Sequence, residues 1–174
     1  MSSDPTTTAF LAEARKTLRR CGGKITHCLG QLSEDDVNWR PFAEANSIAN
    51  IVAHLCGNVG QWIVAGVGGA ADHRDRPGEF ARELRSTSQE LTEELERTLQ
   101  RADDALAAVT AETILAPRKI QGYDETVLSA AFHAITHFEG HTHQVVYITR
   151  LRLGDRYQFK WVPSTPEQVS AGKK

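Results

Sequence analysis

Three histidines in the C-terminal part of the chain are spaced so that a single helix face would carry them. His133, His137 and His141 recur at every fourth residue. In an α-helix, residues at this spacing lie on the same side, one turn apart. Two imidazoles one turn apart can hold the same metal ion, so His137 and His141 are a candidate pair of ligands.

The spacing alone is a weak signal, because histidines one helical turn apart also occur on surfaces and as hydrogen-bonded core residues. Zinc peptidases of the H-E-x-x-H type place a glutamate directly after the first histidine. Here Glu139 is the second residue after His137, and it projects to the opposite side of the helix. The pattern argues against that peptidase class, and no protein general base is evident near the histidines. The sequence therefore leaves the catalytic residues unknown.

A third ligand must come from another helix, and an earlier apolar segment offers one. A narrow polar stripe on this segment consists of Asn50, His54, Asn58 and Gln61. The apolar residues beside the stripe would turn His54 towards a bundle axis. Three neutral histidines leave coordination positions open, which is typical of a catalytic rather than a structural metal. The alternative is an empty site whose histidines are hydrogen-bonded to protein groups.

Apolar periodicity predicts four helices, over residues 8–31, 47–65, 79–109 and 125–153. Residues 32–46 and 110–124 are interpreted as connections, and residues 70–78 as a charged loop. In that loop, Arg74 and Arg76 are more typical of a solvated surface than of a guide for an anionic substrate. Four amphipathic helices favour an all-α four-helix bundle, a fold that binds metals between facing helices.

Length and composition limit the classes of protein to consider. The 174 residues fit one domain, with the bundle over about residues 6–156 and an extended tail over residues 157–174. The 20 basic and 22 acidic residues give a net charge of -2, which argues against nucleic acid or anionic lipid as partners. There is no signal-peptide pattern and no uninterrupted apolar run of about twenty residues, so a cytoplasmic location without membrane attachment is expected. Cys21, Cys28 and Cys56 lack C-x-x-C spacing and are expected to be buried thiols.

Three segments resemble the DinB-like superfamily of bacterial metal-binding proteins, and the resemblance covers nearly the whole chain. They are residues 46–55 (NSIANIVAHL), residues 57–62 (GNVGQW) and residues 133–144 (HAITHFEGHTHQ). The resemblance implies a four-helix bundle with a longer crossover, frequent homodimers, and a three-histidine site for zinc, nickel or a related divalent ion. His54, His137 and His141 match the ligand positions. His143 stands where a glycine often precedes the glutamine.

Several other residues have two interpretations each. His133 is either a fourth ligand or, as we prefer, a residue of the second shell or of the pocket. Asn58 and Gln144 are either partners of the ligands or ordinary polar residues that bridge helices. We expect Trp62 in the core. Surface positions are expected for three further histidines, which are His27, His73 and His143.

Two functional classes remain open. The first is an enzyme whose metal activates a water for hydrolysis, or a low-molecular-weight thiol for transfer to an electrophilic substrate. Some relatives in the DinB-like superfamily are thiol S-transferases, and others look like hydrolases. The second class is a non-catalytic metal-binding or stress-related bundle protein, which the fold alone does not exclude. A coordination position that opens into a pocket would favour the enzyme.

Overall fold

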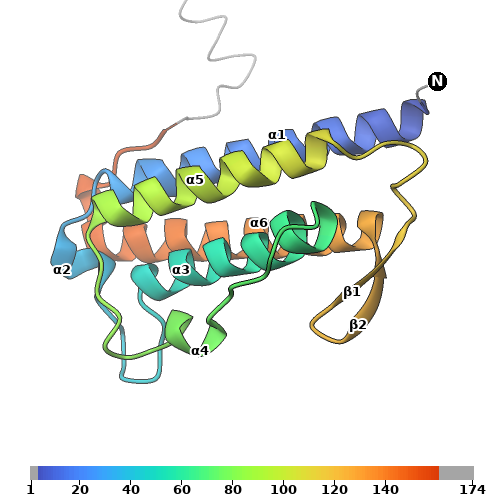
Figure 1. Cartoon of the computed structure of the whole chain (residues 1–174). Coiled ribbons are helices and arrows are strands. Elements are labelled where there is room, and N and C mark those ends of the chain that lie inside the picture. The colour runs from blue at the N-terminus through green and yellow to red at the C-terminus, as the bar shows by residue number, and fades with distance from the viewer. Residues whose placement is uncertain (1–3, 161–174) are drawn as a thin grey trace, which may run out of the picture.

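The structure, a computed structural model, describes residues 4–160. Four long helical segments dominate it (Figure 1). They are α1 (Pro5–Leu29), α3 (Ile48–Val59) with its π-helical continuation η1 (Gly60–Val67), α5 (Ser88–Ala107) and α6 (Val127–Leu153). The short elements are α2 (Glu34–Val37), α4 (Arg76–Glu79), β1 (Pro117–Ile120), β2 (Tyr123–Thr126) and the 3-10 helix η2 (Gly154–Arg156). The predicted all-α bundle of four helices is confirmed.

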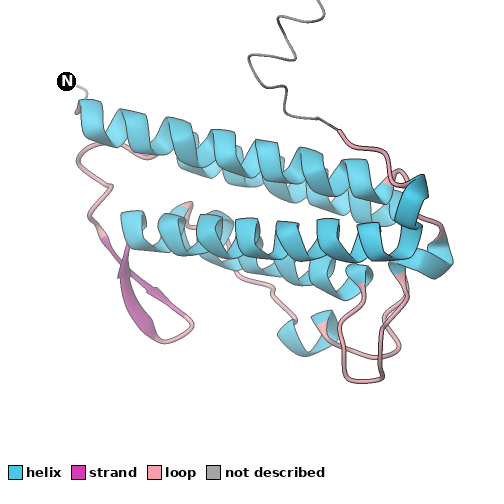
Figure 2. Ribbon diagram, turned by 180° about the vertical axis from the view of Figure 1, so that it is seen from behind, coloured by secondary structure: helices cyan, strands magenta, loops and turns pink. Residues whose placement is uncertain are grey.

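The four helices pack as two layers, with α1 and α5 in one and α3 with η1 and α6 in the other (Figures 1 and 2). Each helix contacts one neighbour in its own layer and one in the other. Helices α3 and α5 run in the same direction, because residues 68–87 carry the chain back along the bundle before α5 begins (Figure 1). The predicted longer crossover is therefore present, and it places α4 beside α3.

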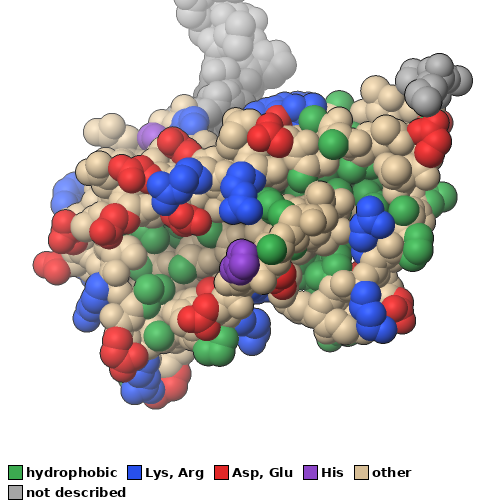
Figure 3. Space-filling model, viewed as in Figure 1, with side chains coloured by type: hydrophobic (Ala, Val, Ile, Leu, Met, Phe, Trp, Pro, Cys, Tyr) green, Lys and Arg blue, Asp and Glu red, His purple; other side chains and the backbone are tan. Residues whose placement is uncertain are grey.

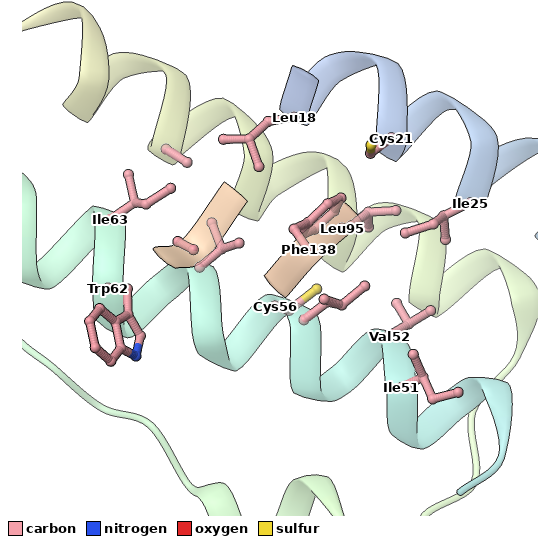
Figure 4. Close-up of a cluster of buried hydrophobic side chains, with 14 of the residues drawn as sticks. Leu18, Cys21, Ile25, Ile51, Val52, Cys56, Trp62, Ile63, Leu95 and Phe138 are labelled. Carbon is pink, nitrogen blue, oxygen red and sulfur yellow. The ribbon is translucent and has the colours of Figure 1, made fainter. Parts of the chain in front are cut away.

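The helix that carries His54 forms much of the core. It begins after Ser47, whose side chain and that of Asn50 form a reciprocal capping box. The segment Ile48–Val67 has the length and apolar composition of a membrane span, but 72% of its apolar window is buried inside the protein. Its apolar side chains pack against those of the other three helices (Figure 4). Its hydrophobicity is thus accounted for by the bundle.

The predicted start of the third helix at residue 79 is wrong. Helix α5 begins at Ser88, where the side chains of Thr87 and Glu90 form a capping box. Glu79 instead ends the short helix α4, nine residues before α5. The helix-forming composition after residue 79 hides this boundary, because glutamate, arginine and leucine are common in helices and crossovers alike. The correction moves Glu79 to the side of α3.

The predicted connection over residues 110–124 contains an antiparallel hairpin, β1 paired with β2. Its turn residues Gln121 and Gly122 both have positive φ, at 53° and 87°, as in the tight turns that favour hairpins. Ile120 packs against η1 at Gly66, where any Cβ would clash with the Ile120 side chain. The hairpin is thereby fixed against η1, close to the start of α6 (Figure 1).

After η2, the chain continues in extended conformation along α1. The backbone N–H of Gln158 donates to Gln31 Oε1 at 2.7 Å, and its carbonyl oxygen lies 2.7 Å from His27 Nε2. The predicted extended tail is therefore seen as far as Lys160, and the rest of it lies outside the described residues. All three cysteines are buried thiols, as expected.

Candidate metal centre

The three predicted ligands meet between α3 and α6. His54 comes from the middle of α3, and His137 and His141 come from consecutive turns of α6. His54 Nε2 and His137 Nε2 lie 3.1 Å apart. One nitrogen from each of the three rings lies within 4.8 Å of the other two. The structure therefore brings together residues that are 83 positions apart in the chain.

The arrangement fits a divalent ion. Two imidazole nitrogens that bind the same tetrahedral zinc ion at 2.0–2.1 Å are about 3.3 Å apart. The separation of 3.1 Å between His54 and His137 is close to this value. The ring centroids of the three histidines are 4.5 to 5.1 Å apart in pairs. The three rings therefore form one cluster whose size suits a single metal ion.

Two of the rings are oriented by hydrogen bonds on their outer nitrogen. His54 Nδ1 donates to Glu79 Oε2 at 2.8 Å, and His141 Nδ1 donates to Gln144 Oε1 at 2.8 Å. An imidazole whose Nδ1 carries the hydrogen has a free lone pair on Nε2, which is the tautomer that a metal requires. His137 Nδ1 and the oxygen Asn58 Oδ1 are buried, and neither has a hydrogen-bond partner within residues 4–160. Both residues line the same cavity.

Glu79 belongs to a buried ion pair. Arg74 donates from Nε to Glu79 Oε1 at 2.7 Å and from Nη2 to Glu79 Oε2 at 2.9 Å. The two side chains are only 3% and 7% exposed. Glu79 reaches α3 because Gly57 leaves room for it, since a Cβ there would clash with the carboxylate. The expectation that Arg74 is a solvated loop residue is wrong. Glu79 was not among the residues predicted for the site.

The surroundings favour the neutral form of the two α6 histidines and the charged form of Glu79. Burial, with the neighbouring His141 and His54 rings, lowers the pKa of His137 to about 4. Burial likewise lowers the pKa of His141. For Glu79, burial acts to raise the pKa, but the hydrogen bonds from Arg74 and His54 outweigh it and hold the pKa below its usual value. Near neutral pH, the two α6 imidazoles are therefore free of the proton that would compete with a metal.

A cavity of about 370 Å³ opens beside His54 and His137. The side chain of Trp62 stacks on the ring of His133 at its rim, with centroids 3.9 Å apart and planes 26° apart. Trp62 is buried, as expected, but its Nε1 has no hydrogen-bond partner in the described part of the chain. His133 lines the cavity and lies outside the three-histidine group.

The remaining histidines lie away from this cluster. His73 and His143 are exposed, and His27 is half-buried beside the extended tail. Glu139 forms an ion pair with Arg20 of α1, on the far side of α6 from the ligands. Arg76 is exposed, with its guanidinium over the ring of Phe80. It nevertheless lines the cavity, which its loop position alone did not indicate.

Two solved structures have a similar fold. A conserved protein from Enterococcus faecalis has 18% identity and a TM-score of 0.67, over 82% of this chain and 96% of the other. A DinB-like protein from Bacillus cereus has 13% identity and a TM-score of 0.61, over 76% of this chain and 85% of the other. No curated protein matches the chain. The fold is thus that of a DinB-like helical bundle.

The family follows from the sequence itself. Residues 5–166 match the family DUF1572, which is described as a protein of unknown function. The match covers nearly the whole chain, so the protein belongs to the DUF1572 family.

Proposed function

We propose that this protein binds one divalent metal ion, zinc or nickel, through His54, His137 and His141, and that it is a metal-dependent enzyme. The observation that carries the proposal is the clustering of three imidazoles, two of them oriented by Glu79 and Gln144. Imidazole ligands suit both metals. A single compact site of this kind, made by two helices of a bundle, is a common setting for metal chemistry.

The chemistry proposed is hydrolysis, or transfer of a low-molecular-weight thiol to an electrophilic substrate. When bound, a divalent ion supplies a Lewis acid that lowers the pKa of a water or thiol. The protein residues hold and shape the site. Glu79 is committed to Arg74 and His54, so it positions a ligand and is not available to accept a proton from substrate. The cavity beside His137 gives a small molecule access.

The alternative is a non-catalytic metal-binding or stress-related bundle protein. Such a protein would need only a closed site, with every buried polar group satisfied. Here the cavity reaches two of the proposed ligands, and Asn58 and Trp62 present polar atoms that find no partner among the residues the structure describes. These features support the enzyme, because unpaired buried polar atoms beside a metal site are suited to binding a substrate.

Elemental mass spectrometry of the untagged protein tests the metal site first. We expect about one zinc or nickel ion per chain, greatly reduced in His54→Ala and His137→Ala. His143→Ala is the matched control, because His143 is exposed on the same helix, and it should retain the metal. Equal metal content in all variants, or none after reconstitution, would sink the proposal. Loaded protein would then be screened for thiol transfer and for hydrolysis.

We further propose that the protein is a cytoplasmic homodimer that does not bind nucleic acid. Helix α6 exposes large apolar side chains along its length, namely Leu128, Phe132, Tyr147 and Leu151. Basic and acidic side chains are interspersed on the face shown in Figure 3, which does not resemble a nucleic-acid surface. Light scattering should give a molar mass of twice that of the chain. In the Phe132→Glu variant, the molar mass should fall to that of a single chain. A monomeric wild-type protein would contradict the dimer.

A further inference from the structure

The cavity beside the histidines is lined by two opposite charges that are not paired with each other. Arg76 comes from α4 and Glu125 from β2, on two different segments of the chain. Within residues 4–160, neither side chain forms an ion pair. The guanidinium of Arg76 lies 5.2 Å from the centroid of Phe80, and the carboxylate of Glu125 accepts a hydrogen bond from Ser129. Both charged groups keep the capacity to bind a ligand.

Two buried polar atoms of the cavity walls also lack partners. Trp62 is 3% exposed and Asn58 is 4% exposed, yet Trp62 Nε1 donates to no group and Asn58 Oδ1 accepts from none among the described residues. Figure 4 shows the indole nitrogen of Trp62 turned away from the hydrophobic cluster. An unsatisfied buried polar group costs roughly 1–3 kcal/mol. Trp62 lies on the π-helix η1, a distortion that often occurs at functional sites.

The charges of the cavity limit the kind of molecule that fits. Arg74 also lines it, but Glu79 neutralises Arg74. Among the described lining residues, Arg76 and Glu125 are thus the Arg, Lys, Asp or Glu side chains outside an ion pair, and Trp62 and Asn58 add a neutral donor and a neutral acceptor. A wholly apolar molecule would leave these groups unsatisfied, and a polyanion would face Glu125. The volume of about 370 Å³ is near the lower end of the range of ligand pockets.

We propose that this cavity binds a small zwitterionic molecule of the α-amino-acid type. Its carboxylate pairs with Arg76, its ammonium group pairs with Glu125, and Trp62 N–H and Asn58 bind its remaining polar atoms. The side chain of the ligand then points to the three histidines. The proposal rests on the proposed metal site only for this last feature, in which a thiol side chain reaches the ion. The low-molecular-weight thiol of the proposed function would then be an amino acid that carries a thiol.

Four thiols that differ only in these charges test the proposal on zinc-loaded protein by calorimetric titration. L-cysteine has both charges, cysteamine lacks the carboxylate, 3-mercaptopropionate lacks the ammonium group, and 2-mercaptoethanol lacks both. We expect cysteine to bind at least tenfold more tightly than the other three. Zinc content measured after each titration checks that no thiol has removed the ion.

Variants assign the preference to individual residues. Arg76→Gln should abolish the preference for cysteine over cysteamine. Glu125→Gln should abolish the preference for cysteine over 3-mercaptopropionate. Trp62→Phe keeps the aromatic stack but removes the N–H. It should weaken the binding of cysteine about tenfold. The controls are Arg85→Gln, an exposed arginine in the crossover after α4, and Asp124→Asn, next to Glu125 on β2. Neither residue lines the cavity. They should leave the ranking unchanged.

The same question can be put to metal-free protein, which separates the two proposals. L-serine, ethanolamine and 3-hydroxypropionate repeat the charge series without a thiol, and ligand-detected NMR measures their binding. If the protein binds no metal but prefers serine, the proposed metal enzyme fails and the zwitterion site stands. If zinc binds but the thiols bind equally, or both preferences survive in Arg76→Gln and Glu125→Gln, the zwitterion site is wrong.

Discussion

Two arginine–carboxylate pairs in this protein have the same forked geometry in opposite surroundings. Arg15 of α1 donates through Nε to Asp103 of α5 at 2.8 Å, and these side chains are 33% and 22% exposed. Arg74 donates through Nε to Glu79 at 2.7 Å, and these side chains are 3% and 7% exposed. Each arginine also donates from its Nη2 to the second carboxylate oxygen. The pairs differ in their exposure to solvent and in the other residues that the carboxylate contacts.

The difference shows what each pair is for. Asp103 also accepts from Arg19, so its cluster joins two helices at the surface, where water screens the charges. Glu79 accepts from His54. A buried pair gains little net stability, because desolvation of two charges offsets their attraction. The arrangement of Glu79 is therefore better explained by the orientation of His54 than by the stability of the fold.

The cavities of the two layers show the same contrast. The groove between α1 and α5 has a volume of about 580 Å³, larger than the 370 Å³ beside the histidines. Yet the buried side-chain atoms without partners in the described residues belong to Asn58, Trp62 and His137, which all line the smaller cavity. Unsatisfied polar groups therefore mark the candidate site, and the larger volume does not.

The largest difference between the two pairs should appear when the carboxylate of each is removed. Glu79→Ala leaves the Arg74 guanidinium buried without its partner, which should lower the free energy of unfolding by about 3–5 kcal/mol. Asp103→Ala breaks an exposed pair and should cost about 0–1 kcal/mol. Urea denaturation of the metal-free proteins measures both. Glu79→Ala should also weaken zinc binding about 10–100-fold, measured by competition with a chromophoric chelator.

Glu79→Gln separates charge from hydrogen bonding in this experiment. It keeps the volume and one acceptor oxygen for His54, so it should recover part of the zinc affinity. Similar losses of stability in Glu79→Ala and Asp103→Ala would contradict the distinction between the two pairs. Unchanged zinc affinity in Glu79→Ala would show that the carboxylate does not orient the ligand.

The sequence predicted the histidines and their helices because both depend on local spacing. His137 and His141 are one turn apart on any helix, and the polar stripe with His54 lies beside an apolar face whatever the rest of the chain does. The crossover is different. Arg74 and Glu79 follow no periodic pattern, and their places depend on the path of residues 68–87 across the bundle. Such a path depends on tertiary contacts, which propensity does not encode.

One signal for the missed carboxylate was present in the sequence. Gly57 interrupts an apolar helix only three residues after His54, and a glycine inside a helix often allows a close approach. What approaches could not be predicted from the chain alone. The structure shows that it is Glu79, 25 residues from its histidine partner.

Gly57→Ala should disturb the buried pair from the side of α3, with an intermediate effect. The added methyl group would clash with the Glu79 carboxylate, so the pair must shift, at a cost of about 1–3 kcal/mol. Zinc affinity should fall with it, because His54 loses its acceptor. Gly60→Ala is the matched control, since a Cβ there meets no atom within 4 Å. If both variants keep wild-type affinity, the close approach at Gly57 has no bearing on the site.

The smallest effect concerns the exposed pair and its dependence on pH. The hydrogen bond from Arg15 holds the pKa of Asp103 below its ordinary value, as does the charge of Arg19. A carboxylate whose pKa is lower in the folded state adds stability above its unfolded pKa of about 4, and this stability is lost as the pH falls through the folded value. Asp103→Asn should therefore be less stable than wild type at pH 7, by up to about 1 kcal/mol. The gap should close below pH 4 in urea denaturation, and a gap of the same size there would mean that its cause is packing rather than charge.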